Sequence, residues 1–506
     1  MRFNLALAGT VVAGCALLGG CMVGPSLRPP KTAMPANWAK SAQPTPGTTA
    51  PAAVSKVTDA PAHLAQWWKT FHDPELTALV DQAARNNLTL REATQQIVEA
   101  LEVRNATAAP LGPFVNAAGS YQHSRTSRNI GPGGNFGPSE TDLYQAGFDA
   151  TWQLDFFGQI RRGVQAANAN YRAAIDNQRG VWVTLLSELA NDYMTLRGVQ
   201  RQIAVTEANL KTQQHTATIL AQQIGGGLST SLALANATAQ VATTESQLPE
   251  LRLQEKQLIY AVSILLGKPP QAMEKQLSVP RPIPSVPPVV PIGLPGALLL
   301  RRPDVRAAQQ QYAAATANVG VAEGNLFPQF TINGNLGYAA SNVTKWFNTS
   351  SLAYGIGPSF SWSILNWGQV QSNINQEKAI RVQALLNYRQ IVLQALDDVS
   401  SALAAYTREQ QHEKLLVQAV AENQKAVLYS TQLYDDGLTN FLNVLSAQQA
   451  LYFSQDALVQ SQSAVSTDLV ALYNALGGGW EAVPAAAVKP NKLMPMTGKR
   501  DALIHP

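Results

Sequence analysis

Four segments of the chain alternate large apolar residues with small or polar ones, which is the pattern of a β-strand with one apolar face. Three clear segments span residues 144–154, 330–340 and 352–364, and a weaker one spans 115–121. The clear segments have 11 residues or more, whereas strands of soluble proteins usually have about 5–6. Because a tilted strand of about 9–11 residues crosses a bilayer, the pattern predicts two membrane-spanning β-hairpins.

The large side chains of these segments are expected to face lipid, and the small and polar ones a water-filled lumen. The side chains predicted to face lipid are Phe148, Trp152, Phe330, Ile332, Tyr354, Phe360 and Trp362. A soluble sandwich with one buried face is the alternative, although two hairpins alone would make a poor sandwich core. Four strands cannot close a barrel, and lipid does not tolerate open sheet edges. Copies of the chain must therefore assemble, and a trimer would supply about 12 strands, an even number as in bacterial barrels.

Two long windows of the chain lack proline, residues 139–248 and 359–483. Since proline costs about 3 kcal/mol in a helix interior, such windows indicate long helices. Apolar residues inside them recur at steps of three and four, as at Leu186, Leu189 and Tyr193. This is the spacing of a coiled coil, so the windows are expected to form long helices that pack side by side.

Each window contains one break, Gly225-Gly226-Gly227 in the first and Asp435-Asp436-Gly437 in the second. Glycine just past a helix end suits a left-handed cap, and Ser229 and Thr439 are expected to cap the helices that follow. Each window is therefore predicted to fold as a helical hairpin. Pro249 lies in the returning arm of the first hairpin and is expected to kink it.

The second half of the chain repeats the first. Five residues recur with an offset of 215, as Arg91, Ala93, Gln96, Leu111 and Pro113 match Arg306, Ala308, Gln311, Leu326 and Pro328. After the loop of the first β-hairpin the offset becomes 210, as Trp152, Gly158 and Gln159 match Trp362, Gly368 and Gln369. The difference falls in a loop between strands, where insertions are tolerated. The sequence therefore predicts an internal duplication.

The N-terminus has the pattern of an export signal, with one charge at Arg2 and an apolar run from Leu5 to Leu18. The run ends in Leu18-Gly19-Gly20-Cys21, which looks like a bacterial lipobox. This likeness implies cleavage before Cys21, acylation of that cysteine and, because Met22 rather than aspartate follows, an address in the outer membrane. Several acyl chains on one cysteine anchor firmly. An ordinary secretory signal with an incidental cysteine is the alternative.

Composition removes several classes of function. The net charge of +4 is too small to indicate nucleic-acid binding. The only two cysteines lie within the first 21 residues, and the six histidines are widely spaced, so no metal site is expected. No Ser-His-Asp order, phosphate loop or dinucleotide fingerprint indicates an enzyme, so no catalytic residue is assigned. The seven methionines form no cluster that would indicate copper export.

Several motifs together resemble one family. The lipobox is followed by Val23-Gly24-Pro25 and by the run WWKTFHDPEL from Trp67 to Leu76. The other motifs are Arg301 to Ala308, Phe327-Pro328, Trp367-Gly368-Gln369 and Gly437-Leu438 leading to Ala447-Gln448. In combination they resemble the TolC-like outer-membrane factors and, within them, the NodT-type efflux lipoproteins. The resemblance covers nearly the whole mature chain.

The resemblance implies a mixed α and β fold, in which three chains share one transmembrane β-barrel with four strands from each. A long α-helical coiled-coil tunnel would continue it through the periplasm. Such a homotrimer is a passive conduit in a tripartite efflux system, and it exports small molecules such as drugs and toxic compounds. It would receive them from an inner-membrane efflux transporter and a periplasmic adaptor (membrane fusion) protein. The lipid on Cys21 would be its one covalent group, and no cofactor or nucleic acid is implied.

On this basis the chain is divided into ten segments. They are a lipoprotein signal peptide (1–20), an acylated N-terminus and linker (21–62), equatorial helices (63–112), a first β-hairpin (113–157), a first helical hairpin (158–268), a Pro-rich equatorial linker (269–303), a second equatorial helix (304–327), a second β-hairpin (328–367), a second helical hairpin (368–477) and a C-terminal tail (478–506). The two β-hairpins contribute to the barrel, and the two helical hairpins to the tunnel.

In the family the closure lies at the periplasmic tips of the helical hairpins, here Gly225 to Ser229 and Tyr434 to Asn440. A carboxylate commonly follows the turn glycine in the family, but this chain has Leu438-Thr439 there. Asp435 and Asp436 are the substitutes, because three copies would bring a ring of carboxylates near one axis that attracts cations. The alternative is that the two aspartates only solvate an exposed turn.

Two further residues are candidates for closing the pore, Tyr434 and Arg197, although Tyr434 also suits the seam of a coiled coil. The tip residues expected to contact the adaptor are Gly227, Leu228, Gly437 and Leu438. Two other functions stay open: an outer-membrane conduit for protein secretion, and a structural or adaptor lipoprotein built on a coiled coil. The second would not need duplicated amphipathic strands.

Overall fold

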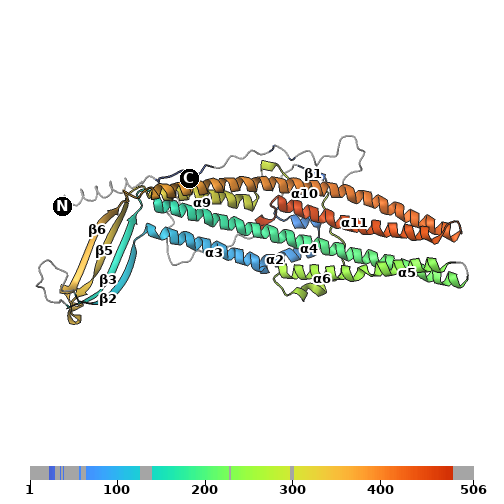
Figure 1. Ribbon diagram of the computed structural model, residues 1–506, viewed down its shortest axis with the longest axis horizontal. Coiled ribbons are helices and arrows are strands. Elements are labelled where there is room, and N and C mark those ends of the chain that lie inside the picture. The colour runs from blue at the N-terminus through green and yellow to red at the C-terminus, as the bar shows by residue number, and fades with distance from the viewer. Residues whose placement is uncertain are drawn as a thin grey trace.

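The computed structural model describes residues 22–28, 64–125, 140–226, 229–296 and 301–482, together with Pro35, Trp38 and residues 56–58. The chain is elongated, with a β-sheet at one end and long helices that run from it to the opposite end (Figure 1). In these described ranges, no helix combines the length and the apolar character that a membrane crossing requires. The mixed α and β fold predicted from the sequence is confirmed.

The sheet contains the four strands predicted from the alternating pattern. They are β2 (Phe114–Arg125), β3 (Glu140–Leu154), β5 (Gln329–Ala340) and β6 (Leu352–Ser361). The strands are antiparallel in the order β2-β3-β5-β6, so the two hairpins pair through β3 and β5. The prediction for the last strand was too long, because β6 ends at Ser361 and the predicted segment ran to Ile364.

Two helices dominate the rest of the chain, α4 (Gln159–Gly225) and α10 (Gln369–Asp435), each of 67 residues. At about 1.5 Å per residue each is near 100 Å long. The predicted breaks are present, since α4 ends at Gly225 and α10 at Asp435. The returning arm of the second hairpin is α11 (Phe441–Ala475).

The returning arm of the first hairpin consists of two helices, α5 (Ser231–Glu245) and α6 (Gln247–Leu265). The interruption at Ser246 lies three residues before Pro249, as expected because proline cannot donate the bond that would continue the helix. Both predicted N-caps were wrong by one residue. Thr230 caps α5 with its hydroxyl, which accepts from the Ala233 amide, and Asn440 precedes α11.

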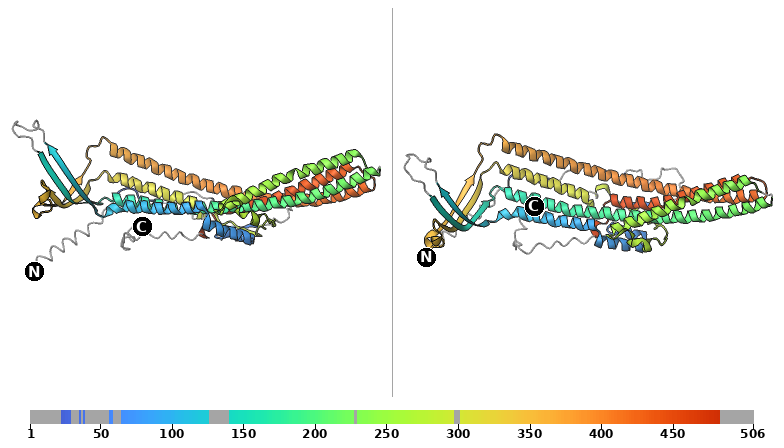
Figure 2. Two further views of the ribbon diagram at one scale, coloured as in Figure 1. Left: turned by 90° about the horizontal axis from the view of Figure 1, so that it is seen from below. Right: turned by 60° about the horizontal axis from the view of Figure 1, so that its bottom comes forward.

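Shorter helices complete the wall beside the long ones. They are α2 (Pro74–Asn86), α3 (Leu88–Ala108), α7 (Glu274–Leu277) and α9 (Pro303–Gly324). Near the sheet, the helices lie side by side in the order α10, α9, α4 and α3 (Figure 2). Farther from it, α11 takes the place of α9, and α5 with α6 takes the place of α3. Between the sheet and the opposite end, the chain therefore forms a wall about four helices wide.

The main hydrophobic core lies where these two sets of helices meet. Trp67, Phe71 and Leu76 from the WWKTFHDPEL run are at most 2% exposed there, packed with Tyr193 of α4 and Tyr473 of α11. A short parallel pair, β1 (Lys56–Thr58) with β4 (Val289–Pro291), lies beside this core. The coiled-coil spacing of the long windows is thus explained by burial in one seam.

The duplication is visible in matching hydrogen bonds. The indole Nε1 of Trp152 donates to the carbonyl oxygen of Leu111, and that of Trp362 to Leu326, both at 3.1 Å. Both pairs fall at the offsets found in the sequence. Each bond anchors the end of the second strand of a β-hairpin to the segment that precedes the first strand, so the two halves place their strands on their helices in the same way.

Candidate functional site

The far ends of the two helical hairpins are joined by a small core of their own. Its buried members are Leu220 of α4, Ala233 and Ala237 of α5, and Phe441 and Val444 of α11. This tip core, as we call these residues, is separate from the main core. It holds the two hairpins together at the end farthest from the sheet.

Tyr434 covers this tip core from α10. Its ring lies 5.8 Å from that of Phe441, and its hydroxyl donates to Oε1 of Gln223 on α4 at 3.1 Å. The side chain is half-buried. Tyr434 therefore links the last turn of one long helix to the last turn of the other, as well as packing in the seam.

The turn after α10 is a glycine cap. Gly437 has φ of +71°, and the amides of Gly437 and Leu438 donate to the carbonyls of Tyr434 and Leu433. This is the bonding pattern of a Schellman motif, which requires the left-handed conformation that glycine adopts without strain. The motif leaves Asp435 and Asp436 exposed at the tip, and Leu438 is 73% exposed. The other predicted tip residues, Gly227 and Leu228, lie outside the described residues.

The prediction that Arg197 helps to close the pore is wrong. Arg197 lies 28 residues before the end of α4, about 42 Å along the helix, and is fully buried. Its Nη2 is 2.6 Å from Glu75 Oε2, and its Nη1 donates to the carbonyls of Leu277 and Val279. Arg197 therefore fixes α2 and the segment after α7 to α4 inside the main core.

One face of the sheet is apolar across all four strands. Phe148 of β3 pairs in register with Leu336 of β5, which pairs with Tyr354 of β6. Trp152 pairs with Ile332, and Phe330 pairs with Phe360 on the same face. Tyr354 is 78% exposed and Phe360 is 69% exposed, so this face is uncovered in a single chain. Trp362 follows the end of β6 and is half exposed.

The opposite face of the sheet is small and polar. Asp149 pairs with Asn116 and Asn335, and next to it Thr151 donates to Oδ1 of Asn333 at 3.4 Å. Asp149, Thr151, Asn333 and Asn335 are among the residues that line a hollow of about 510 Å³. The two faces thus differ as the walls of a water-filled pore in lipid must.

A glycine pair forms the centre of the polar face. Gly147 and Gly337 face each other across β3 and β5, and a Cβ on Gly337 would lie 2.6 Å from the carbonyl oxygen of Ala146. Only glycine allows the strands of the two repeats to approach this closely.

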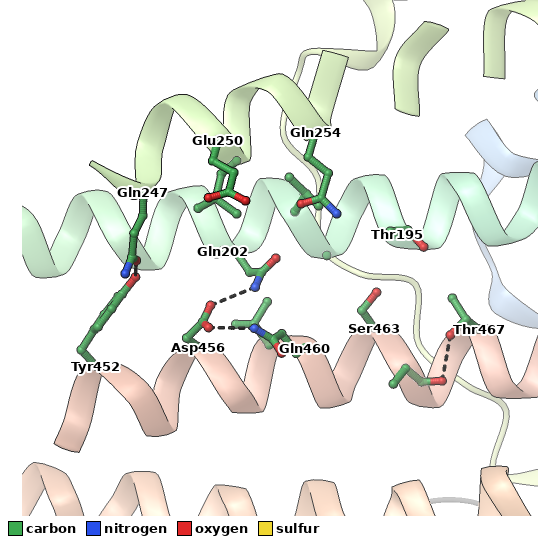
Figure 3. A pocket seen from close by; sticks show the side chains of 15 residues that line it. Thr195, Gln202, Gln247, Glu250, Gln254, Tyr452, Asp456, Gln460, Ser463 and Thr467 are labelled. Carbon is green, nitrogen blue, oxygen red and sulfur yellow. Dashed lines mark hydrogen bonds between the residues drawn. The ribbon is translucent and has the colours of Figure 1, made fainter. Parts of the chain in front are cut away.

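A polar groove of about 570 Å³ lies between α4, α6 and α11. Figure 3 shows Asp456 at its centre, where Gln202 donates to one carboxylate oxygen at 2.9 Å and Gln460 to the other at 2.8 Å. At the end of the groove the hydroxyl of Tyr452 donates to Gln247. Because these groups satisfy one another, the groove is a hydrogen-bonded seam between the hairpins.

Two acids of the helical wall have altered acidity. Burial raises the pKa of Asp192 on α4 to about 6, and Glu188 adds to the effect. Burial likewise raises the pKa of Asp468 on α11 to about 6, with Glu409 of α10 adding to it. Among the described residues, no group of three or more potential ligands is placed to hold a metal ion.

The sequence did not indicate Gln223 or Arg162. Gln223 is one of many glutamines on α4, and only the position of Tyr434 in space selects it. Arg162 is buried at the start of α4, with only 5% of it exposed. The Val23-Gly24-Pro25 motif was the available signal for it, because the Arg162 guanidinium binds the main chain of that motif.

Comparison with known proteins agrees with this architecture. The family model described as outer membrane efflux protein matches residues 79–268 and 294–478. The pyoverdine export outer membrane protein OpmQ of Pseudomonas aeruginosa is 30% identical over 476 residues, which cover 93% of this chain and 97% of OpmQ. Nodulation protein T of Rhizobium leguminosarum bv. viciae is 29% identical, with 93% of each chain covered. The solved outer-membrane channel OprN has a TM-score of 0.84 and 32% identity, covering 91% of this chain and 100% of OprN.

Proposed function

Because the chain belongs to the outer membrane efflux protein family, we propose that it forms an acylated, trimeric exit duct whose periplasmic end is closed at the helical tips. It is the outer-membrane component of a tripartite efflux system, with its helical wall in the periplasm.

The observation that carries the proposal is the sheet. It has one continuous apolar face, one polar face and two edge strands, β2 and β6, that have no strand beside them among the described residues. Open edges and an exposed apolar face are incompatible with a stable single chain in water. Three copies joined edge to edge would close a barrel of about 12 strands, which is an allowed number for bacterial barrels.

The helical wall supports the same assembly. At one edge of the wall, α10 exposes Val382, Leu386 and Leu393, with exposed fractions of 48%, 55% and 59%. Their steps of four and seven place them on one stripe of the helix. On the opposite edge of the wall, Val103 of α3 is 56% exposed. In a ring of three copies, α10 of one copy would pack on α3 of the next and cover both edges.

The lipid on Cys21 would anchor the trimer beside its barrel. Cys21 lies outside the described residues, but Met22 begins the described chain at the junction of β3 and α4. A lipid attached one residue earlier would enter the bilayer next to the barrel wall. The lipobox-like sequence is the support for the acylation itself.

The closure would lie at the helical tips, where Tyr434, Asp435 and Asp436 stand. The bond from Tyr434 to Gln223 holds α10 against α4, and three copies would bring the exposed carboxylates of Asp435 and Asp436 around one axis. Such a ring attracts cations and repels anions. The exposed Gly437 and Leu438, with Gly227 and Leu228, are the tip residues proposed to contact the adaptor.

The cargo is proposed to be small molecules delivered by an inner-membrane pump through its adaptor. The relative OpmQ is named for pyoverdine export, which is the support for a small-molecule cargo over protein secretion. A structural or adaptor lipoprotein would have no use for a sheet with one polar and one exposed apolar face.

Reconstitution tests the proposal. The purified, acylated protein is added to a planar bilayer, and the same protein denatured by heat serves as the control. We expect trimer bands on gels that disappear on boiling, and small single-channel currents that increase when the tips are opened by substitution. A monomer that becomes water-soluble once its acyl chains are removed, and that never conducts, would rule the duct out.

A further inference from the structure

The Val23-Gly24-Pro25 motif lies against the turn that joins the sheet to α4. The amide of Val23 donates to the carbonyl oxygen of Phe157 at 3.1 Å. The guanidinium of Arg162 donates to the carbonyl oxygens of Val23 and Gly24, at 2.8 and 3.0 Å. We propose that Gly158, Arg162 and Gly320 form a docking site for the main chain of residues 22–24, and that this site fixes where the lipid anchor enters the membrane.

Arg162 is suited to this role because its charge is buried. Only 5% of the residue is exposed, and its third nitrogen donates to Gln165 Oε1 at 2.8 Å. Glu323 attracts the guanidinium of Arg162 through its charge, but its carboxylate pairs with Lys378 at 3.7 Å. The two carbonyls of the N-terminal segment are therefore direct acceptors for a largely buried cation, and losing them would remove two charge-assisted hydrogen bonds.

Two glycines make room for the segment. Gly158 begins α4 with φ of +76°, and a Cβ there would lie 2.6 Å from Cγ of Met22. Gly24 itself has φ of +95°, and a Cβ on it would lie 2.4 Å from Cα of Gly320. The motif glycine thus has two physical requirements, a left-handed backbone and contact with the backbone of α9.

The duplicated half of the chain provides an internal comparison. Gly368 matches Gly158 and has the same left-handed conformation, φ of +82°, but no described atom lies within 4 Å of where its Cβ would be. At the offset of 210 the counterpart of Arg162 is Ser372, and at 215 the counterpart of Gly320 is Asn105. The repeat keeps the turn and lacks the docking residues, so these residues serve the N-terminal segment and not the turn.

The site has a consequence for the anchor. Residue 21 is covalently next to Met22, and consecutive Cα atoms are about 3.8 Å apart. Holding Met22 at Gly158 therefore holds the start of the acyl chains at the sheet–helix junction. This inference rests on the proposed acylation for its consequence, but the docking itself does not depend on efflux.

A nitroxide label at Ser26→Cys tests the docking in the full-length, membrane-extracted trimer. Ser26 is exposed and lies two residues from Gly24. We expect an immobilised electron paramagnetic resonance spectrum in the parent, and loss of the immobilised component in Arg162→Gln. Arg172→Gln removes an equal charge from an exposed position ten residues along α4, so it should leave the spectrum unchanged.

A second variant excludes misfolding as the cause. Gly24→Ala changes only the segment and leaves α4 and α9 intact, yet its Cβ would collide with Gly320. We expect the same mobile spectrum with unchanged helix content by circular dichroism. Arg28→Ala, an exposed position in the same segment, is the matched control. If the label is as immobile in Arg162→Gln and Gly24→Ala as in the controls, or is mobile in the parent, the docking site does not exist.

Intact mass measured on the same samples separates this result from the proposed function. It reports whether residue 21 carries a lipid, and an unmodified residue 21 would refute the acylation. In that case the labelling is repeated with Cys21→Ser, so that the nitroxide sits on position 26 alone, and the spectra still decide whether the segment docks.

Discussion

The hydroxyl of Tyr434 donates to the side-chain oxygen of Gln223, and this 3.1 Å bond joins two residues that are 211 positions apart in the chain. The two residues stand at the ends of α10 and α4, the longest helices of the molecule. Since the bond lies within one chain, the chain's own contacts hold the tip in one shape.

Removing this bond should loosen the proposed closure. We expect Tyr434→Phe to keep the ring packed on Phe441 and to lose only the hydrogen bond, worth about 1 kcal/mol. Single-channel recordings should show a higher open probability or conductance. Tyr429→Phe, at a 57% exposed position on the same helix, should show the same open probability and conductance as the parent. If the parent and Tyr434→Phe give identical current traces, the bond between Tyr434 and Gln223 does not contribute to the closure.

The acidic pair at the tip should set the preference for ions. Replacing Asp435 and Asp436 together by serine removes up to about six carboxylates from the axis of a trimer, so the preference for cations should decline. Reversal potentials in a salt gradient measure this. The single exchange Asp81→Ser on α2, also exposed, serves as the control. An unchanged reversal potential would mean that the aspartates only solvate the turn.

The glycine pair in the sheet should tolerate no side chain. We expect Gly337→Ala to cost about 1–3 kcal/mol, because the added carbon meets the backbone of β3. The midpoint temperature at which the trimer band dissociates on gels should decrease. Gly357→Ala is the comparison, since no described atom lies within 4 Å of its Cβ position. A parental midpoint for Gly337→Ala would contradict the register of β3 with β5.

The buried ion pair between Arg197 and Glu75 should matter for stability and not for conductance. Breaking a buried pair by removing one partner costs about 3–5 kcal/mol, so Arg197→Met should lower the unfolding midpoint clearly. Arg201→Met, one turn along and exposed, should not. We expect the double variant Arg197→Met with Glu75→Gln to recover part of the loss, because it leaves no buried carboxylate, and Arg281, the second cation beside Glu75, is half-exposed to water. Channels that do form should conduct as the parent does.

Two raised acids should make the helical wall more stable at low pH. The folded pKa values of Asp192 and Asp468 are about 6, above their ordinary value of 3.8. Between those values the folded state binds more protons than the unfolded state, so stability rises as the pH falls from 7 towards 4. Thermal unfolding should show Asp192→Asn and Asp468→Asn to be more stable than the parent at pH 8 and less sensitive to pH. If the thermal stability of both variants changes with pH as that of the parent does, Asp192 and Asp468 are not the cause of the pH dependence.

The sequence predicted those parts of the fold that depend on a repeated physical pattern. The period of two located four strands, and the proline-free windows indicated two long helical hairpins, whose first arms, α4 and α10, end at the predicted breaks. Both patterns arise because each element has one apolar face, so many residues of the element contribute to the same periodic signal. The end of β6 was placed too late because Trp362 and Ile364 continue the alternation after the pairing has stopped.

Single contacts between distant residues could not be predicted in this way. The sequence made Arg197 a further candidate for closing the pore, and nothing in it placed Glu75 beside that arginine. Gln223 is one of many glutamines on α4, and only the folded structure shows that it accepts a hydrogen bond from Tyr434. Thr230 and Ser229 are both good caps, and only the path of the backbone selects Thr230.

The two halves of the chain bind equivalent main-chain carbonyls near the ends of their returning helices with different side chains. Asn87 Nδ2 donates to the carbonyl oxygen of Leu265 at 2.9 Å, and in the second half Arg302 Nη1 donates to Ala475 at 3.0 Å. Arg302 also binds Asp304 and Asp398, which the amide of Asn87 cannot imitate. The internal duplication thus lets one position of the repeat hold its helix end by an amide in the first half and by an ion-paired guanidinium in the second, which two identical repeats could not do.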